Sequence, residues 1–280
     1  MNSLDLTKER PSKFWWTSLI LYAFFALAGG LLAHPFVTWI SSDPVLVEQV
    51  GGLYGFAGST FLTIVYTVWL KKRSIRALGF NQKDFVATYA TGLGIGLALA
   101  VLVIGAVTLL GGFGFSLNRQ IDWLWILLAA GGFFIQGLTE EVLTRGFLFN
   151  ELAAHKGRIF ATVVSALAFT TLHAANPGMT FMPILNLFIF GIFFALLYWL
   201  TDNIWLVGAA HSIWNFSLGP LMGIQVSGQS FPVTVFTSQT AGSALINGGS
   251  FGVEGSIFTS IFGLVASALV WYLIGKKEFA

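Results

Sequence analysis

The sequence predicts an all-α polytopic membrane protein, a bundle of about eight transmembrane helices with both termini in the cytoplasm. Two features of the composition point to this class. Charged residues make up only 9% of the 280 residues, whereas roughly a quarter of a soluble domain is charged. Hydrophobic residues account for 56%, and the mean hydropathy is +0.80. This composition excludes a water-soluble enzyme, a disordered chain and a nucleic-acid-binding protein, each of which needs more charge.

The apolar segments are the third observation. A span needs about 20 mainly apolar residues, and eight segments approach this length. In chain order they are 14–39, 52–70, 85–110, a segment from 122 into the region of 140, 159–173, 181–200, 204–222 and 257–274. No internal repeat or second domain is evident, so we expect a single membrane domain over 1–280.

The first segment raises the question of cleavage, because Ala26-Leu27-Ala28 resembles a signal-peptidase site. Apolar residues continue through Phe36, Val37 and Trp39, so the segment is long enough to span, and we expect it to stay uncleaved. His34, in the same segment, lacks a polar companion nearby in the sequence, and we interpret it as structural.

The orientation follows from the basic residues. Every Lys and Arg except Arg119 falls on one side of an eight-span topology, and the positive-inside rule places that side in the cytoplasm. We therefore expect a multi-pass protein with both termini cytoplasmic. The compactness of the chain favours the cell membrane of a prokaryote.

Two glycine-rich segments stand out. Residues 223–256 form a long stretch rich in Gly, Ser, Thr and Gln with no Lys or Arg, which we expect to be an external loop that partly dips back into the membrane. Gly92 and Gly96 in the third segment are spaced for close helix packing.

Ionisable side chains inside spans are costly to insert, so each indicates a candidate functional site. Glu141 and Arg145 are four residues apart, which places them on one helix face as an ion pair. The side chain of Glu140 is rotated by about 100° around the helix from that of Glu141, so it must face a different part of the protein. A buried carboxylate without a full ionic partner suits a general base working near neutral pH. The alternative is that these charges form a cytoplasmic helix end.

His173 is expected to lie at the depth of Glu140. The polar turn around Lys156 separates two antiparallel segments; Glu140 lies 16 residues before Lys156 and His173 lies 17 after it. At 1.5 Å per residue, both lie about 25 Å from the tip of the helical hairpin.

His211 and Asn215 form a second pair four residues apart, on one face of the seventh segment. An imidazole and a carboxamide together offer hydrogen-bond donors for a developing oxyanion.

These segments together resemble the CAAX-protease and bacteriocin-processing (CPBP/Abi) family, intramembrane proteases similar to the type II CAAX prenyl endopeptidase. The family pattern EExxxR, FxxxH and HxxxN/D reads here as Glu140-Glu141-xxx-Arg145, Phe169-xxx-His173 and His211-xxx-Asn215. The flanks Arg145-Gly146-Phe147 and Trp214-Asn215-Phe216 agree as well. The resemblance covers residues 131–226, which it implies are the catalytic core.

The resemblance implies an endopeptidase that hydrolyses peptide bonds in membrane-associated peptides or proteins. Glu140 would activate water with help from His173, and His211 and Asn215 would hold the oxyanion. Arg145, together with Glu141, would orient the site.

A cofactor is not expected, although zinc is the alternative, with Glu140, His173 and His211 as ligands. A catalytic zinc site usually has three protein ligands, and Glu140 could not easily be both ligand and base. We therefore favour a metal-free glutamic mechanism. The chain has no Cys, which excludes thiolate catalysis and cysteine-ligated metals.

The expected partners are the lipid bilayer and a peptide or membrane-protein substrate, with no nucleic acid; the sequence does not indicate an oligomeric state. Two other functions remain open. One is a non-proteolytic immunity factor or regulatory scaffold on the same fold, which would have no need to bury Glu140 and two imidazoles. The other is a proton-coupled transporter, which predicts repeat symmetry between the halves of the chain.

Overall fold

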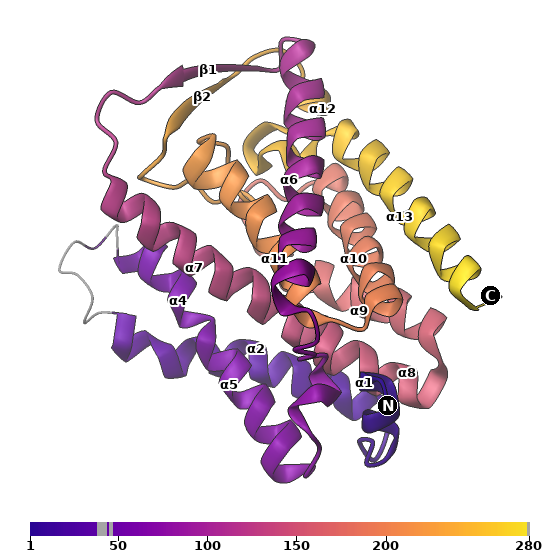
Figure 1. Ribbon diagram of the computed structural model, residues 1–280. Helices are drawn as coiled ribbons and strands as arrows, with labels where there is room; N and C mark the ends of the chain where they lie inside the picture. Colours follow the sequence, from indigo (N-terminus) through magenta and orange to yellow (C-terminus); the bar gives the residue numbers. More distant parts are fainter. Residues whose placement is uncertain (38–43, 45–46, 279–280) are drawn as a thin grey trace.

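The computed structural model describes residues 1–37, 44 and 47–278 and is predominantly helical (Figure 1). The α-helices are α1 (Ser3–Lys8), α2 (Trp15–Val37), α4 (Gly52–Gly55), α5 (Ala57–Ile64), α6 (Phe85–Leu109), α7 (Trp123–Glu141), α8 (Asn150–Lys156), α9 (Arg158–Leu172), α10 (Phe181–Thr201), α11 (Ile204–Phe216), α12 (Ala244–Asn247) and α13 (Ile257–Glu278). This architecture confirms the predicted all-α membrane bundle.

Shorter π- and 3₁₀-helical segments connect several of these helices. The π-helical segments are η1 (Val47–Gly51), η2 (Val65–Leu70), η4 (Val142–Phe149) and η5 (Ser217–Leu221). The 3₁₀ segments are η3 (Ile75–Leu78), η6 (Gly249–Phe251) and η7 (Val253–Gly255). A two-stranded antiparallel ribbon, β1 (Phe113–Leu117) with β2 (Phe236–Thr240), completes the fold, and Phe113 pairs with Thr240.

Six helices in the described part of the chain are long and apolar enough to cross a membrane: Trp15–Leu32, Val47–Leu70, Phe85–Leu109, Trp123–Lys156, Phe181–Thr201 and Ile257–Glu278. The predicted count of eight is therefore not confirmed. The helix in the fifth segment, Arg158–Leu172, is shorter than a full span. In the seventh segment, α11 ends at Phe216 and passes into η5, and it carries His211, Ser212 and Asn215.

The helices that carry the site lie in the interior of the bundle. Helix α11 packs against both α6 and α7, while α10 packs against α9 and α13. Gly92 and Gly96 allow the close approach of α6 to α11: an added Cβ would lie 2.3 Å from the Leu206 carbonyl oxygen and 2.1 Å from that of Ala210. The predicted role of this glycine pair in helix packing is thus realised against the helix that carries His211.

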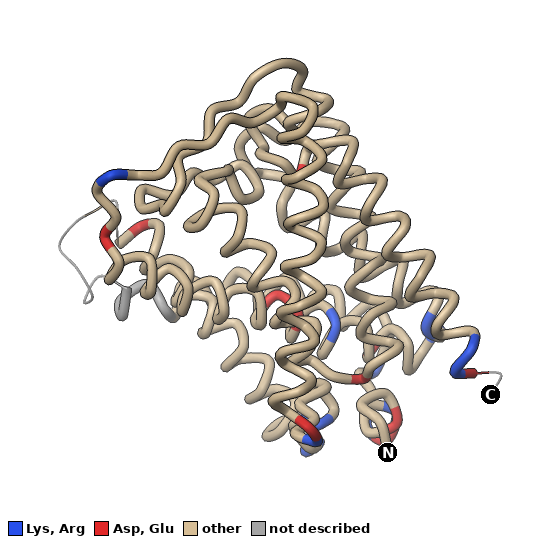
Figure 2. Tube along the Cα trace, turned by 45° about the horizontal axis from the view of Figure 1, so that its top comes forward, with Lys and Arg blue, Asp and Glu red and all other residues tan. Residues whose placement is uncertain are grey.

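The two termini lie at the same end of the bundle. The backbone N–H of Ser3 donates to both carboxylate oxygens of Asp202, at 3.2 and 3.0 Å, and Nζ of Lys277 donates to the Leu200 carbonyl oxygen at 2.8 Å. Figure 2 shows most of the Lys and Arg positions toward this end, whereas β1 and β2 lie at the opposite end, at the top of Figure 1. The same-side placement agrees with the predicted topology; its cytoplasmic assignment stays a prediction.

A buried ion pair fastens the N-terminal segment to this end. Nη2 of Arg73 lies 2.6 Å from Oε1 of Glu151, and the two side chains are 3% and 0% exposed. The other Glu151 oxygen accepts the Ser12 N–H at 2.8 Å, and the Arg73 guanidinium donates to the Arg10 carbonyl oxygen. The segment that follows α1, with Arg10 and Ser12, is therefore tied to α8, at the end of the continuous helix that carries Glu140. His34 lies in α2, but its side chain is outside the described part of the structure.

Candidate active site

One continuous helical segment, Trp123–Lys156, carries both glutamates of the first motif. It begins at Asp122, whose carboxylate caps the helix by accepting the N–H groups of Leu124 and Trp125 at 3.1 and 3.3 Å. Directly after Glu141 the segment becomes the π-helix η4. Local π-helical segments occur frequently at functional sites. No pattern in the sequence predicts the π-helix η4.

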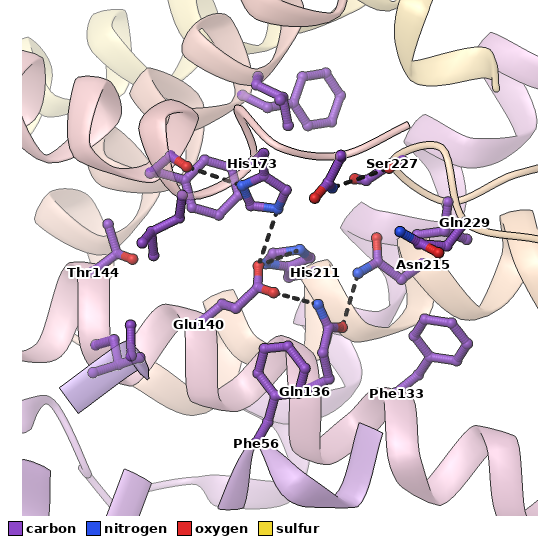
Figure 3. Close-up of a pocket in the computed structure, with 18 of the residues that line it drawn as sticks. Phe56, Phe133, Gln136, Glu140, Thr144, His173, His211, Asn215, Ser227 and Gln229 are labelled. Atoms are coloured by element: carbon purple, nitrogen blue, oxygen red, sulfur yellow. Dashed lines mark hydrogen bonds and ion pairs between the residues drawn. The ribbon is translucent and has the colours of Figure 1, made fainter. Parts of the chain in front are cut away.

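Glu140 points into a cavity (Figure 3). Its Oε1 accepts a hydrogen bond from the Gln136 side-chain amide. Its Oε2 is buried and accepts no hydrogen bond from any residue that the structure describes. The imidazole Nε2 atoms of His211 and His173 lie 3.7 and 4.0 Å from it. A buried acceptor in this position is costly unless a water or substrate atom satisfies it.

The helical hairpin brings His173 to Glu140, as their equal distances from the turn predict. Gly157 adopts a positive φ of +83° at the turn, which favours glycine. His173 then lies at the C-cap of α9. Its Nδ1 lies 2.9 Å from the Phe169 carbonyl oxygen, which leaves Nε2 facing Glu140.

Glu141 has a different environment from its neighbour. Its Oε1 accepts from Nη1 of Arg145 at 2.9 Å, which is the predicted pair, and it also lies 2.8 Å from Nδ1 of His211. Arg145 further donates to the Gly191 carbonyl oxygen at 2.9 Å and lies over the ring of Phe169, 5.0 Å from its centroid. Both charged side chains are fully buried, so this cluster fixes the position of His211.

Asn215 lies on the same face of α11 as His211, as predicted, but its amide is already engaged. Nδ2 of Asn215 donates to Oε1 of Gln136 at 3.0 Å, and Gln136 in turn donates to Glu140. Gln136 was not among the site residues predicted from the sequence. Its spacing of four residues before Glu140 on one helix is the signal that could have indicated it.

The cavity has a volume of about 410 Å³ and a mainly apolar wall. Side chains of α2, α4, α5, α7, η4, α9, α10 and α11 contribute to it, including Phe133, Phe190 and Trp214, and Phe56 joins them from between α4 and α5. Part of the long loop 223–256 closes one side through Val226, Ser227, Gln229, Phe231 and Glu254. None of these five was a predicted site residue, because a loop carries no periodicity that would place its side chains.

The described residues contain no group of three or more His, Asp or Glu side chains arranged to hold a metal ion. Oε1 of Glu140 is occupied by the Gln136 amide, and the two Nε2 atoms approach only Oε2. The zinc alternative, with Glu140, His173 and His211 as ligands, therefore stays a prediction that the arrangement of the described residues does not support.

The fold and site define a class: a polytopic helical membrane protein that encloses a carboxylate and two imidazoles within an apolar cavity. Residues 122–217, about a third of the chain, match the family model described as Type II CAAX prenyl endopeptidase Rce1-like. This match supports the resemblance seen in the motifs: over these residues the chain is similar to the type II CAAX prenyl endopeptidases. The matched segment contains all six predicted site residues. A comparison with curated proteins finds no match to the chain.

Proposed function

We propose that the protein is an intramembrane endopeptidase in which Glu140 activates a water molecule with help from His173. Its substrates are membrane-associated peptides or proteins. The observation that carries this proposal is the buried Oε2 of Glu140, which accepts no hydrogen bond within the described part of the protein and lies within 4.0 Å of two imidazole Nε2 atoms. A water molecule bound there would lie between an acceptor and an imidazole, as general-base catalysis requires.

The reaction follows from this placement. Glu140 takes a proton from the water, and the resulting hydroxide adds to the carbonyl carbon of the scissile peptide bond. The C–N bond then breaks, and the proton held by Glu140 passes to the leaving amine nitrogen. His173 holds the water through Nε2, since its Nδ1 is bound to the Phe169 carbonyl oxygen.

His211 and Asn215 are the proposed oxyanion donors. Glu141 accepts at Nδ1 of His211 and favours an imidazolium whose Nε2–H points toward the cavity. Asn215 gives one amide hydrogen to Gln136 and has a second available for the oxyanion. In an apolar cavity such donors stabilise a developing charge far more than they would in water.

The test is the Glu140→Gln variant of the purified full-length protein in detergent or liposomes. We expect cleavage of membrane-derived peptides, measured as new N-termini by mass spectrometry, to be abolished while the helical circular dichroism spectrum is retained. Glu48→Gln, an exposed carboxylate outside the cavity, is the matched control and keeps wild-type activity.

Two outcomes would contradict the proposal. Cleavage by Glu140→Gln at the wild-type rate would show that Glu140 is not the base. A folded wild-type protein that cleaves nothing would favour the non-proteolytic scaffold instead.

A further inference from the structure

A second carboxylate, that of Glu254, lines the same cavity as Glu140. Glu140 belongs to helix α7, whereas Glu254 belongs to the loop 223–256. Ser227 and Gln229, from the same loop, lie across the cavity from Thr144 in Figure 3. Glu254 therefore belongs to the wall that a bound substrate would face while its scissile bond lies at Glu140.

The Glu254 carboxylate is held in place by neutral donors alone. Its Oε1 accepts from the indole Nε1 of Trp214 at 3.3 Å. Its Oε2 accepts from the backbone N–H of Ser227 and from the Ser227 hydroxyl, the latter at 3.1 Å. Ser227 adopts a left-handed φ of +48°, an uncommon conformation for a residue other than glycine. The loop is thus folded so that it presents donors to this carboxylate.

The charge of Glu254 has no counterion in the described part of the protein. No ion pair forms on it, and no Lys or Arg among the described residues lines the cavity. The whole loop 223–256 lacks Lys and Arg. The nearby guanidinium of Arg145 is paired with Glu141 and fully buried.

A neutral side chain such as Gln could accept the same hydrogen bonds and hold the loop in place. The negative charge of Glu254 is partly buried, and such a charge is costly when no cation pairs with it. The surroundings would suit a side chain that has an apolar stem and a cationic end, because Trp214 and Phe190 pack together in the wall at 4.9 Å between ring centroids. Lys and Arg bury such stems along apolar surfaces while their charge is solvated or paired.

We propose that Glu254 is a specificity-determining residue that binds a Lys or Arg side chain of the substrate close to the cleaved bond. This inference rests on the proposed peptidase activity and names a substrate class for it: peptides with a basic residue on the Glu254 side of the scissile bond. An acidic residue at the same position is excluded by repulsion from Glu254.

The test uses pairs of synthetic membrane-anchored peptides that are identical except for one residue. At each position flanking the bond that the wild type cleaves, one pair of peptides carries Lys or Met. A second pair carries Glu or Gln at the same position. At one of these positions we expect kcat/KM to be about tenfold higher for Lys than for Met, the size of effect that a charge-assisted contact provides. The peptide with Glu should be the poorest substrate.

Glu254→Gln should bring the Lys-to-Met ratio close to unity while the Met peptide is still cleaved. Ser227→Ala is the matched control: it removes one hydrogen bond to Glu254 and loosens the loop but keeps the charge, so it should retain the preference for Lys. A purely structural role of Glu254 would instead lower cleavage of both peptides equally in Glu254→Gln.

The inference is overturned if the wild type cleaves Lys and Met peptides equally at every flanking position, a result that needs no variant and does not depend on how well Glu254→Gln folds. It is also overturned if Glu254→Gln retains the ratio. Either result leaves the peptidase activity standing, whereas a failure of the proposed function appears as cleavage that Glu140→Gln does not abolish.

Discussion

Nδ1 of His211 lies 2.8 Å from Oε1 of Glu141, although 70 residues separate the two in the sequence. The same oxygen accepts from Arg145. The two neighbouring glutamates therefore have different environments: Glu141 is held in a buried cluster with an imidazole and a guanidinium, while Glu140 presents a free oxygen to the cavity.

Replacing Glu141 by Gln should impair both activity and stability. The fully buried Arg145 would lose its counterion, and breaking a buried pair from one side costs about 3–5 kcal/mol. The imidazole of His211 would lose the acceptor that orients it. We expect cleavage to fall about a hundredfold, as it does when a catalytic group is misplaced, together with a lower unfolding midpoint in a denaturant titration. Glu140→Gln is the control, since it should abolish cleavage without this loss of stability; equal stability of the two variants would contradict the prediction.

Gln136 should be a positioning residue for Glu140, because it accepts from Asn215 and donates to Glu140. Gln136→Ala should lower kcat by about tenfold or more with little change in KM, because misplacing a reacting group affects the chemical step. In a double-mutant cycle, Gln136→Ala and Asn215→Ala should be non-additive, since contacting residues couple. Strictly additive effects would show that the two side chains act separately.

Metal removal distinguishes the glutamic mechanism from the zinc alternative. The purified protein, dialysed against a strong chelator, should retain its full cleavage rate, and elemental analysis should find no zinc in stoichiometric amount. The reason is that the described residues contain no group of three or more His, Asp or Glu side chains arranged to hold a metal ion. Loss of activity on chelation that zinc alone restores would establish the metalloprotease.

The stability of the membrane-embedded fold should fall slightly as the pH rises above the ordinary pKa of an aspartate. Burial raises the pKa of Asp202 above its usual value of 3.8, an effect that the hydrogen bonds from Ser3 only partly oppose. Because the folded state binds this proton more tightly than the unfolded state, the stabilisation is complete below pH 3.8 and is lost as the pH rises through the raised pKa. Asp202→Asn should lack this dependence in unfolding titrations across the same range; an identical pH profile in the variant would contradict it.

The ion pair between Arg73 and Glu151 should contribute to anchoring the N-terminal segment. Arg73→Met would leave the fully buried Glu151 carboxylate without its cation, and we expect a loss of about 3–5 kcal/mol in unfolding free energy. Adding Glu151→Met should recover most of this loss, since replacing both members of a buried pair with apolar residues is often close to neutral. Limited proteolysis near Arg10 would report release of the segment in the single variant. A double variant as unstable as the single one would contradict the prediction.

The sequence was sufficient for the fold class and for the contacts that depend on helical spacing. Glu141 with Arg145 and His211 with Asn215 follow from the periodicity of one helix, and the approach of His173 to Glu140 follows from counting back from a turn. The alternative reading, a cytoplasmic helix end at Glu140, Glu141 and Arg145, does not fit the structure, because Glu141 and Arg145 pair inside the protein and the helix continues to Lys156. Charge alone was a poor guide to where the span ends.

The remaining features required the three-dimensional structure. That His211 binds Glu141 depends on how α11 packs against α7, which no local pattern encodes. Glu254 and Ser227 reach the cavity through an irregular loop whose path is set by individual turns. The expected count of eight spans is not confirmed, because the fifth and seventh segments form the shorter helices Arg158–Leu172 and Ile204–Phe216.

The continuous helix Trp123–Lys156 has 34 residues, which corresponds to a length of about 50 Å at 1.5 Å per residue. The hydrocarbon core of a bilayer is only about 30 Å thick, so this helix must tilt or project from the membrane. Glu140 lies near its middle, and its depth relative to the lipid is therefore set by that tilt. If Glu140 acts as the proposed base, bilayer thickness becomes a physical variable of cleavage: thinner or thicker lipid would move its carboxylate along the membrane normal and change which peptide bonds of an embedded substrate it reaches.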